Sequence, residues 1–152
     1  MELFKDCKNI TFVDIASDGL KHIKNIYPNS QIVVSSADNL EKINDNEYDT
    51  YISLRTFNSS FFNIDKSLNE AKRVLKPKSK IIISIANGFL SVNSKIIPGL
   101  IIPGTDFVDI YKGIDYVKNI INLMSKLGFD TFKLLATNEE LYLTANLTKK
   151  GR

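Results

Sequence analysis

The chain has 152 residues, of which 43% are hydrophobic and 24% charged, with a formal net charge of +3 at pH 7. This balance fits one compact domain over residues 1–152, and the lack of any apolar run of about 18 residues excludes a membrane-spanning helix. The lone Cys7 excludes an intramolecular disulfide, and Met1–Cys7 has neither the basic start nor the apolar core of a signal peptide, so we expect a cytoplasmic location.

The first third of the chain predicts two short strands with a helix between them. Residues 9–15 are a β-branched run that ends in a carboxylate, which is typical of a buried strand. A helix follows, with Ser17 or Asp18 as its expected N-cap. Residues 31–35 predict the second strand, and residues 38–47 predict a short helical turn and loop.

The middle of the chain predicts a crossover unit of a parallel sheet, made of a strand (48–54), a helix (62–75) and a strand (80–86). Apolar side chains recur along the helix at steps of four, three and four, which gives it one buried stripe. These side chains are Ile64, Leu68, Ala71 and Leu75. The last strand has almost no polar break, so we expect it to be covered on both faces.

The last third predicts an irregular segment, a helix and a hairpin. Residues 88–111 form an apolar excursion punctuated by two Pro-Gly pairs, which we interpret either as a flap covering the core or as a lid or acceptor-binding wall. A helix is expected at 115–127. Strands at 129–137 and 141–148 are separated by a turn too short for anything but antiparallel pairing, so one reversed strand should finish a parallel sheet.

Polar residues cluster where the predicted parallel strands end, which is where open parallel sheets bind ligands. The clusters are Asp14-Ile15, Ser36-Ala37-Asp38, Ser53-Leu54-Arg55 and Asn87-Gly88. A carboxylate that closes a strand can accept two hydrogen bonds, so Asp14 could hold both hydroxyls of a ribose. The alternative is that Asp14 only caps a turn or the next helix.

Taken together, these clusters resemble the successive motifs of class I S-adenosylmethionine-dependent methyltransferases. The motifs are Val13-Asp14-Ile15-Ala16, Ser36-Ala37-Asp38-Asn39-Leu40, Glu47-Tyr48-Asp49 and Glu70-Ala71-Lys72-Arg73-Val74-Leu75-Lys76-Pro77, followed by the Ile81 to Ile85 strand. The resemblance implies a Rossmann-like, three-layer α/β sandwich with a mostly parallel sheet and a C-terminal antiparallel hairpin. The closing hairpin argues against a nicotinamide-binding domain, which also needs a glycine-rich turn.

The resemblance also implies a cofactor site. Its residues would be Asp14, Ile15, Ser36, Ala37, Asp38, Ser53 and Arg55. Asp14 would bind the cofactor ribose, Ile15 would pack on the adenine, and Ser36 with Ala37 would meet the adenine edge. Many relatives have an acidic residue at the position of Ser36, so Asp38 could make that contact instead. The segment from Ser53 to Arg55 would border the methionine end and the methyl acceptor.

One family element is not found in the sequence. The glycine-rich first strand and turn should precede Asn9, but no glycine occurs before Gly19. In the family that strand lies between the strands that end here at Asp14 and Leu54, and each buried unpaired backbone group would cost about 1 to 3 kcal/mol. Three outcomes are open: the two strands pair directly, another chain in a homo- or hetero-oligomer fills the gap, or the chain is a shortened form of a longer protein.

The leading hypothesis is methyl transfer from S-adenosylmethionine to a small-molecule acceptor. Such a displacement needs the acceptor and the cofactor to be aligned, and it needs a general base where the acceptor must lose a proton. The candidates for this base are Asp106 and Asp109. His22 is expected on the exposed side of its helix. The alternative is a catalytically silent methyltransferase-like module that binds or regulates a partner. No metal site is predicted, and nucleic acid is not indicated: the basic group at 72–80 is either a solvated turn or a phosphate-binding patch.

Overall fold

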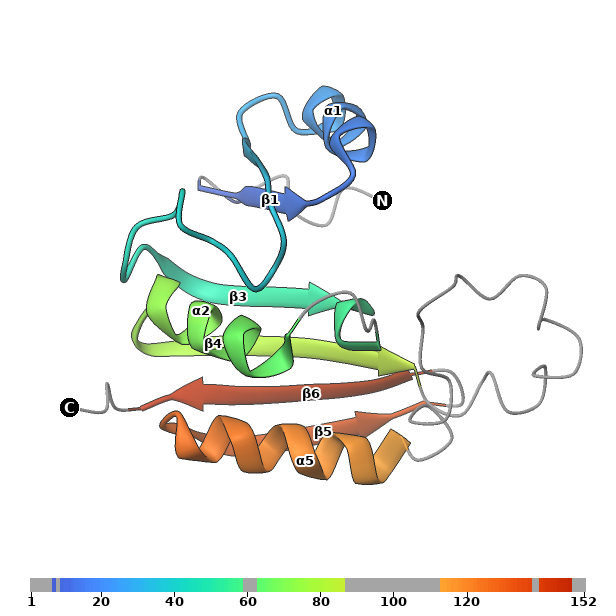
Figure 1. Ribbon diagram of the computed structural model, residues 1–152, viewed down its shortest axis with the longest axis vertical. Coiled ribbons are helices and arrows are strands. Elements are labelled where there is room, and N and C mark those ends of the chain that lie inside the picture. The colour runs from blue at the N-terminus through green and yellow to red at the C-terminus, as the bar shows by residue number, and fades with distance from the viewer. Residues whose placement is uncertain (1–6, 8, 59–62, 87–112, 138–139, 149–152) are drawn as a thin grey trace, which may run out of the picture.

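The computed structural model describes residues 7, 9–58, 63–86, 113–137 and 140–148, and its strands form two sheets (Figure 1). In the smaller sheet, β1 (Thr11–Asp14) pairs in parallel with β2 (Gln31–Val34), and α1 (Ser17–Ile26) connects them. The larger sheet contains, in spatial order, β3 (Tyr48–Leu54), β4 (Leu75–Ala86), β6 (Glu140–Leu147) and β5 (Phe129–Ala136). Within it β3 and β4 are parallel, whereas β6 runs antiparallel to both of its neighbours.

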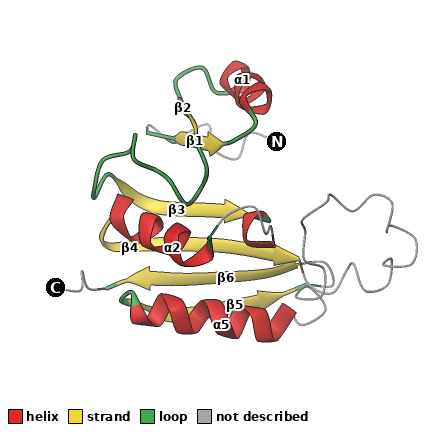
Figure 2. Cartoon of the chain, viewed as in Figure 1, coloured by secondary structure: helices red, strands yellow, loops and turns green. Residues whose placement is uncertain are grey.

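Two helices cover one face of the larger sheet, as Figure 2 shows. They are α2 (Ile64–Val74), whose N-cap Asn63 accepts a hydrogen bond from the Lys66 amide at 3.0 Å, and α5 (Gly113–Lys126). Leu68 and Ala71 of α2 pack with Ile120 and Met124 of α5 in the main hydrophobic core. A short 3₁₀ helix, η1 (Thr56–Asn58), follows β3 and buries Phe57 in the same core. In the described part of the chain, no helix is long and apolar enough to cross a membrane.

The α/β fold, the crossover unit and the C-terminal antiparallel hairpin are confirmed, and the fold is Rossmann-like. The reversed strand, β6, lies between β4 and β5 and does not finish the sheet as expected. Two other details are wrong. The N-cap of α1 is Ala16, because the Asp14 carboxylate accepts a hydrogen bond from the Ala16 amide and Ser17 already has helical geometry. Residues 38–47 form turns without a helix. The predicted excursion at 88–111 lies outside the described residues.

The two sheets do not join. β1 and β3 run in the same direction and lie on either side of a gap (Figure 1), but no backbone pairing connects them and no described strand lies between them. Direct pairing of the strands that end at Asp14 and Leu54, one of the three expected outcomes, is therefore not seen in the described structure.

Arg73 of α2 holds the segment between the sheets in place. Its guanidinium donates to the Ile43 carbonyl, the Leu40 carbonyl, the Asp45 carboxylate and the Glu70 carboxylate, each at 2.8 Å. Glu70 in turn accepts from the Leu40 amide at 2.7 Å, and the hydrogen bond from Arg73 is the main reason why the pKa of Glu70 lies below its ordinary value. Lys76 of the basic group likewise has a carboxylate partner, Asp49, at 2.8 Å.

A second, smaller core lies behind this segment. It is formed by Val33 of β2, Leu40, Ile43 and Val74, and Val13, Tyr48 and Tyr51 pack against it. This cluster draws side chains from both sheets, so it and the Arg73 contacts connect two sheets that share no described backbone pairing.

We expect Arg73→Ala to lower the free energy of unfolding by about 2 kcal/mol, because it leaves the Leu40 and Ile43 carbonyls and the Glu70 carboxylate without their charged donor. Urea denaturation measures the change. Lys72→Ala is the matched control, since Lys72 is on the same helix and has no ion-pair partner in the described structure. Equal unfolding of the two variants would show that Arg73 does not hold the segment.

The same contact should make stability depend on pH. Because the pKa of Glu70 is lowered in the folded state, its stabilising effect is complete above the unfolded value, about 4.3, and is lost as the pH falls through the folded value. We expect Glu70→Gln to be less stable than the parent at pH 6 and to approach it at pH 3, as measured by urea denaturation at both values. A constant difference would contradict this linkage.

Candidate functional site

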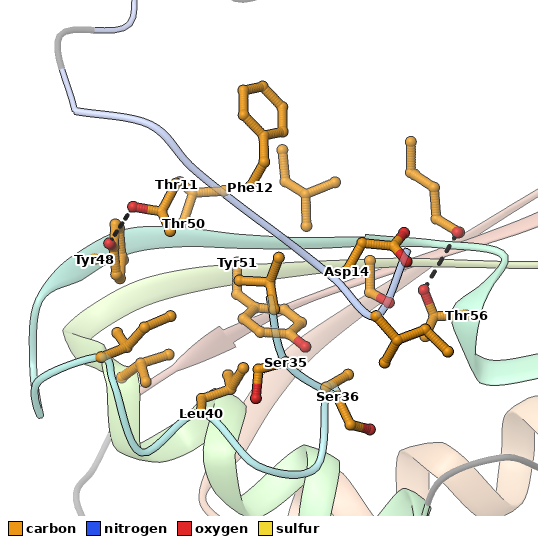
Figure 3. Close-up of a pocket in the computed structure, with 18 residues that line it drawn as sticks. Thr11, Phe12, Asp14, Ser35, Ser36, Leu40, Tyr48, Thr50, Tyr51 and Thr56 are labelled. Atoms are coloured by element: carbon orange, nitrogen blue, oxygen red, sulfur yellow. Dashed lines mark hydrogen bonds between the residues drawn. The ribbon is translucent and has the colours of Figure 1, made fainter. Parts of the chain in front are cut away.

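A cleft of about 540 Å³ lies between β1 and β3, within the size range of small-molecule sites. It is lined by residues 11–15, 35–37 and 50–54, together with Leu40, Ile43, Tyr48, Thr56 and Val74 (Figure 3). The cleft exists because the two sheets face each other across the gap without pairing. The described lining contains a single charged side chain, that of Asp14, and no glycine.

Asp14 lies at the carboxyl end of the cleft. Figure 3 shows its side chain at the same end as Ser36 and Thr56, away from Tyr48. Its Oδ1 atom accepts a hydrogen bond from the Ala16 amide at 2.8 Å, and Oδ2 has no partner among the described residues. The two interpretations of Asp14 are therefore compatible, because one oxygen caps the turn while the other can accept from a ligand.

Four other predicted cofactor residues also line this cleft: Ile15, Ser36, Ala37 and Ser53. Ile15 is 67% exposed and offers an apolar surface directly after Asp14, whereas Ser53 is buried. The neighbouring Ser35 hydroxyl donates to the Asn39 carbonyl, which closes the turn that carries Ser36 and Ala37. The carboxyl end of the cleft thus combines a carboxylate, an exposed apolar side chain and hydroxyl groups.

The other two predicted cofactor residues are not part of the lining. Asp38 accepts a hydrogen bond from the Asn63 amide at 2.9 Å, and this bond is the main reason why the pKa of Asp38 is lowered. Arg55 has a left-handed φ of 58°, and its guanidinium forms an ion pair with Glu140. Asp38 therefore connects the turn after β2 to the start of α2, and Arg55 connects the end of β3 to β6.

The remaining candidates lie elsewhere. Asp106 and Asp109 are outside the described residues, and His22 is exposed on α1, as expected. In the described part of the chain, no group of three His, Cys, Asp or Glu side chains is placed to hold a metal ion.

Two tyrosines of β3, Tyr48 and Tyr51, line the cleft but were not among the predicted site residues. The Tyr48 hydroxyl lies 2.5 Å from the Thr11 hydroxyl and shares a hydrogen bond with it, which bridges β3 and β1. Burial raises the pKa of Tyr48 and of Tyr51, so both stay neutral and act as apolar walls with a polar tip. The sequence signal that could have indicated them is the presence of aromatic residues on the strand beside the expected gap.

The family and the fold are known from comparisons with other proteins. The sequence model of the methyltransferase domain matches residues 1–83, more than half of the chain, and the chain belongs to this family. No curated protein matches the sequence. The fold is shared with solved structures of SAM-dependent methyltransferases, that is, enzymes that use S-adenosylmethionine.

Three solved structures illustrate this similarity. A SAM-dependent methyltransferase from Aquifex aeolicus is 16% identical, with a TM-score of 0.70 over 97% of this chain and 73% of the other. One from Methanosarcina mazei is 16% identical, with a TM-score of 0.65 over 92% and 82%. The carbon methyltransferase CurJ is 14% identical, with a TM-score of 0.70 over 91% of this chain and only 41% of CurJ.

Proposed function

We propose that this chain binds S-adenosylmethionine at the carboxyl end of the cleft and supports methyl transfer to a small-molecule acceptor. The observation that carries the proposal is the position of Asp14, whose Oδ2 atom has no described partner, on one cleft with Ile15, Ser36 and Ala37. Membership of the methyltransferase family supplies the reaction class.

The lining fits the adenosine portion of this cofactor. The Asp14 carboxylate is suited to accept hydrogen bonds from the ribose hydroxyls, and Ile15 offers an apolar surface for the adenine. Ser36 and Ala37 are placed to meet the edge of the base. Ser53, farther along the cleft wall, would border the methionine end. The methionine end of this cofactor is usually bound by backbone that approaches it closely at glycines. The described lining has no glycine, so it does not supply this contact.

When bound, the cofactor supplies a methyl group on a sulfonium, and the protein contributes mainly alignment of the acceptor. Asp106 and Asp109 remain the proposed general bases, and the cytoplasmic location remains part of this proposal.

Calorimetric titration with S-adenosylmethionine tests the assignment. We expect binding by the parent chain and at least about tenfold weaker binding by Asp14→Ala, since a charge-assisted hydrogen bond is worth about 1.5 to 3 kcal/mol. Asp18→Ala is the matched control, because the Asp18 side chain is 91% exposed on α1 and is not part of the cleft lining. Equal affinity of the two variants would refute the role of Asp14.

Asp38 should behave differently from Asp14. Asp38→Ala removes the acceptor for the Asn63 amide at the start of α2, so we expect a loss of about 1 kcal/mol in unfolding free energy. Its affinity for S-adenosylmethionine should stay within about twofold of the parent. A tenfold loss of affinity with unchanged stability would instead assign Asp38 to the adenine site.

A second candidate function is a methyltransferase-like module that binds a partner without transferring a methyl group. It is favoured by the exposure of Ile52 and Leu54, 44% and 59%, on a strand that has no pairing partner among the described residues along one edge. This candidate predicts no heat on titration with S-adenosylmethionine, in contrast to the first.

A further inference from the structure

The turn of residues 36–39 carries the two side chains that we propose to meet the edge of the base. The Asn39 amide donates to the Ser36 carbonyl at 3.0 Å, which closes the turn. The chain enters the turn from a fixed point, because the Ser35 amide donates to the Asp14 carbonyl of β1 at 3.0 Å. The direction in which the turn leaves this point therefore depends on how its other end is held.

Leu40, the residue after the turn, is held through both of its backbone groups by one pair of side chains on α2. Its amide donates to the Glu70 carboxylate at 2.7 Å, and its carbonyl accepts from the Arg73 guanidinium at 2.8 Å. Two parallel hydrogen bonds of 2.8 Å join the pair, from two nitrogens of Arg73 to the two oxygens of Glu70. A bidentate pair of this kind fixes orientation as well as distance.

The side chain of Leu40 does not supply this orientation. It is 2% exposed and belongs to the second core, with Val33 and Ile43. Apolar burial has no direction, so it keeps Leu40 inside without selecting one orientation of its backbone. Hydrogen bonds to both backbone groups do select one, and that orientation directs the turn just before it. Figure 3 shows Leu40 and Ser36 on the same loop beside the cleft.

We propose that Glu70 and Arg73 are positioning residues of the cofactor site, which act through Leu40 on the turn that carries Ser36 and Ala37. Neither belongs to the cleft lining, so the pair affects the ligand only through the turn. This inference rests on the proposed function, because it concerns the same site. It makes the affinity for the nucleobase depend on α2, a helix that supplies no contact to the base.

The pair is distinct from the other link between the turn and α2. Asp38 accepts from the Asn63 amide through its side chain, and this bond leaves the backbone of the turn free to change direction. The Glu70 and Arg73 side chains are 21% and 28% exposed, so their bonds to Leu40 are partly shielded from water. Hydrogen bonds in such surroundings are stronger than those in open solvent.

Calorimetric titration of the full chain with S-adenosylmethionine, at a temperature where every variant is folded, tests the inference. We expect Glu70→Ala to bind about tenfold more weakly than the parent, because a turn that must be ordered on binding lowers affinity. The matched control is Ile120→Val, which destabilises the main core on α5 and should bind within about twofold of the parent. Equal affinity of the parent and Glu70→Ala would overturn this inference alone. No heat from the parent would overturn the proposed function, on which the inference rests.

Residue-resolved amide exchange without ligand separates positioning from general destabilisation. In Glu70→Ala the Leu40 amide should exchange at least about tenfold faster than in the parent, whereas the Ser35 amide should not change. Glu70→Gln keeps an oxygen that can accept from Leu40, so its exchange rate and its affinity should both lie between those of the parent and Glu70→Ala. Weaker binding without faster exchange at Leu40, or equal acceleration at both amides, would refute the positioning role.

Discussion

The Arg73 guanidinium is the most connected group between the two halves of this structure, with four hydrogen-bonding partners around it. The sheets share no strand pairing among the described residues, so their relative position depends on side chains and on the segment between them, whose Asn46 and Glu47 amides donate to the Arg73 and Val74 carbonyls. Arg73 fixes the segment from Leu40 to Asp45 on α2, and the Thr11 hydroxyl meets that of Tyr48 across the gap. Since charge-assisted hydrogen bonds are about twice as strong as neutral ones, a few of them can hold an arrangement that strand pairing would normally secure.

The cleft follows directly from this arrangement, and its two ends differ in chemistry. At the carboxyl end, Asp14 and Ser36 present oxygen atoms beside the exposed Ile15. Farther in, the walls are apolar side chains and strand edges. The first region suits a small polar ligand such as a nucleoside.

The sequence located the cofactor candidates at the ends of parallel strands, and the structure brings five of the seven together: Asp14, Ile15, Ser36, Ala37 and Ser53. Asp38 and Arg55 were grouped with them because they follow the same strands. Their partners, Asn63 and Glu140, lie 25 and 85 residues away along the sequence, and no local sequence pattern predicts such contacts. Arg73 was missed for the same reason, because its carbonyl and Asp45 partners are 28 to 33 residues distant.

By itself the sequence determined the order of strands and helices, the antiparallel hairpin at the end of the sequence, and the carboxylate that closes β1. These features depend on periodicity, turn length and local hydrogen bonding, which act over a few residues. Only the tertiary structure decided that β1 and β3 face each other without pairing, and that Asp38 and Arg55 bind other parts of the protein. Those outcomes depend on competition among distant partners for the same groups, and that competition is settled only when the chain is folded.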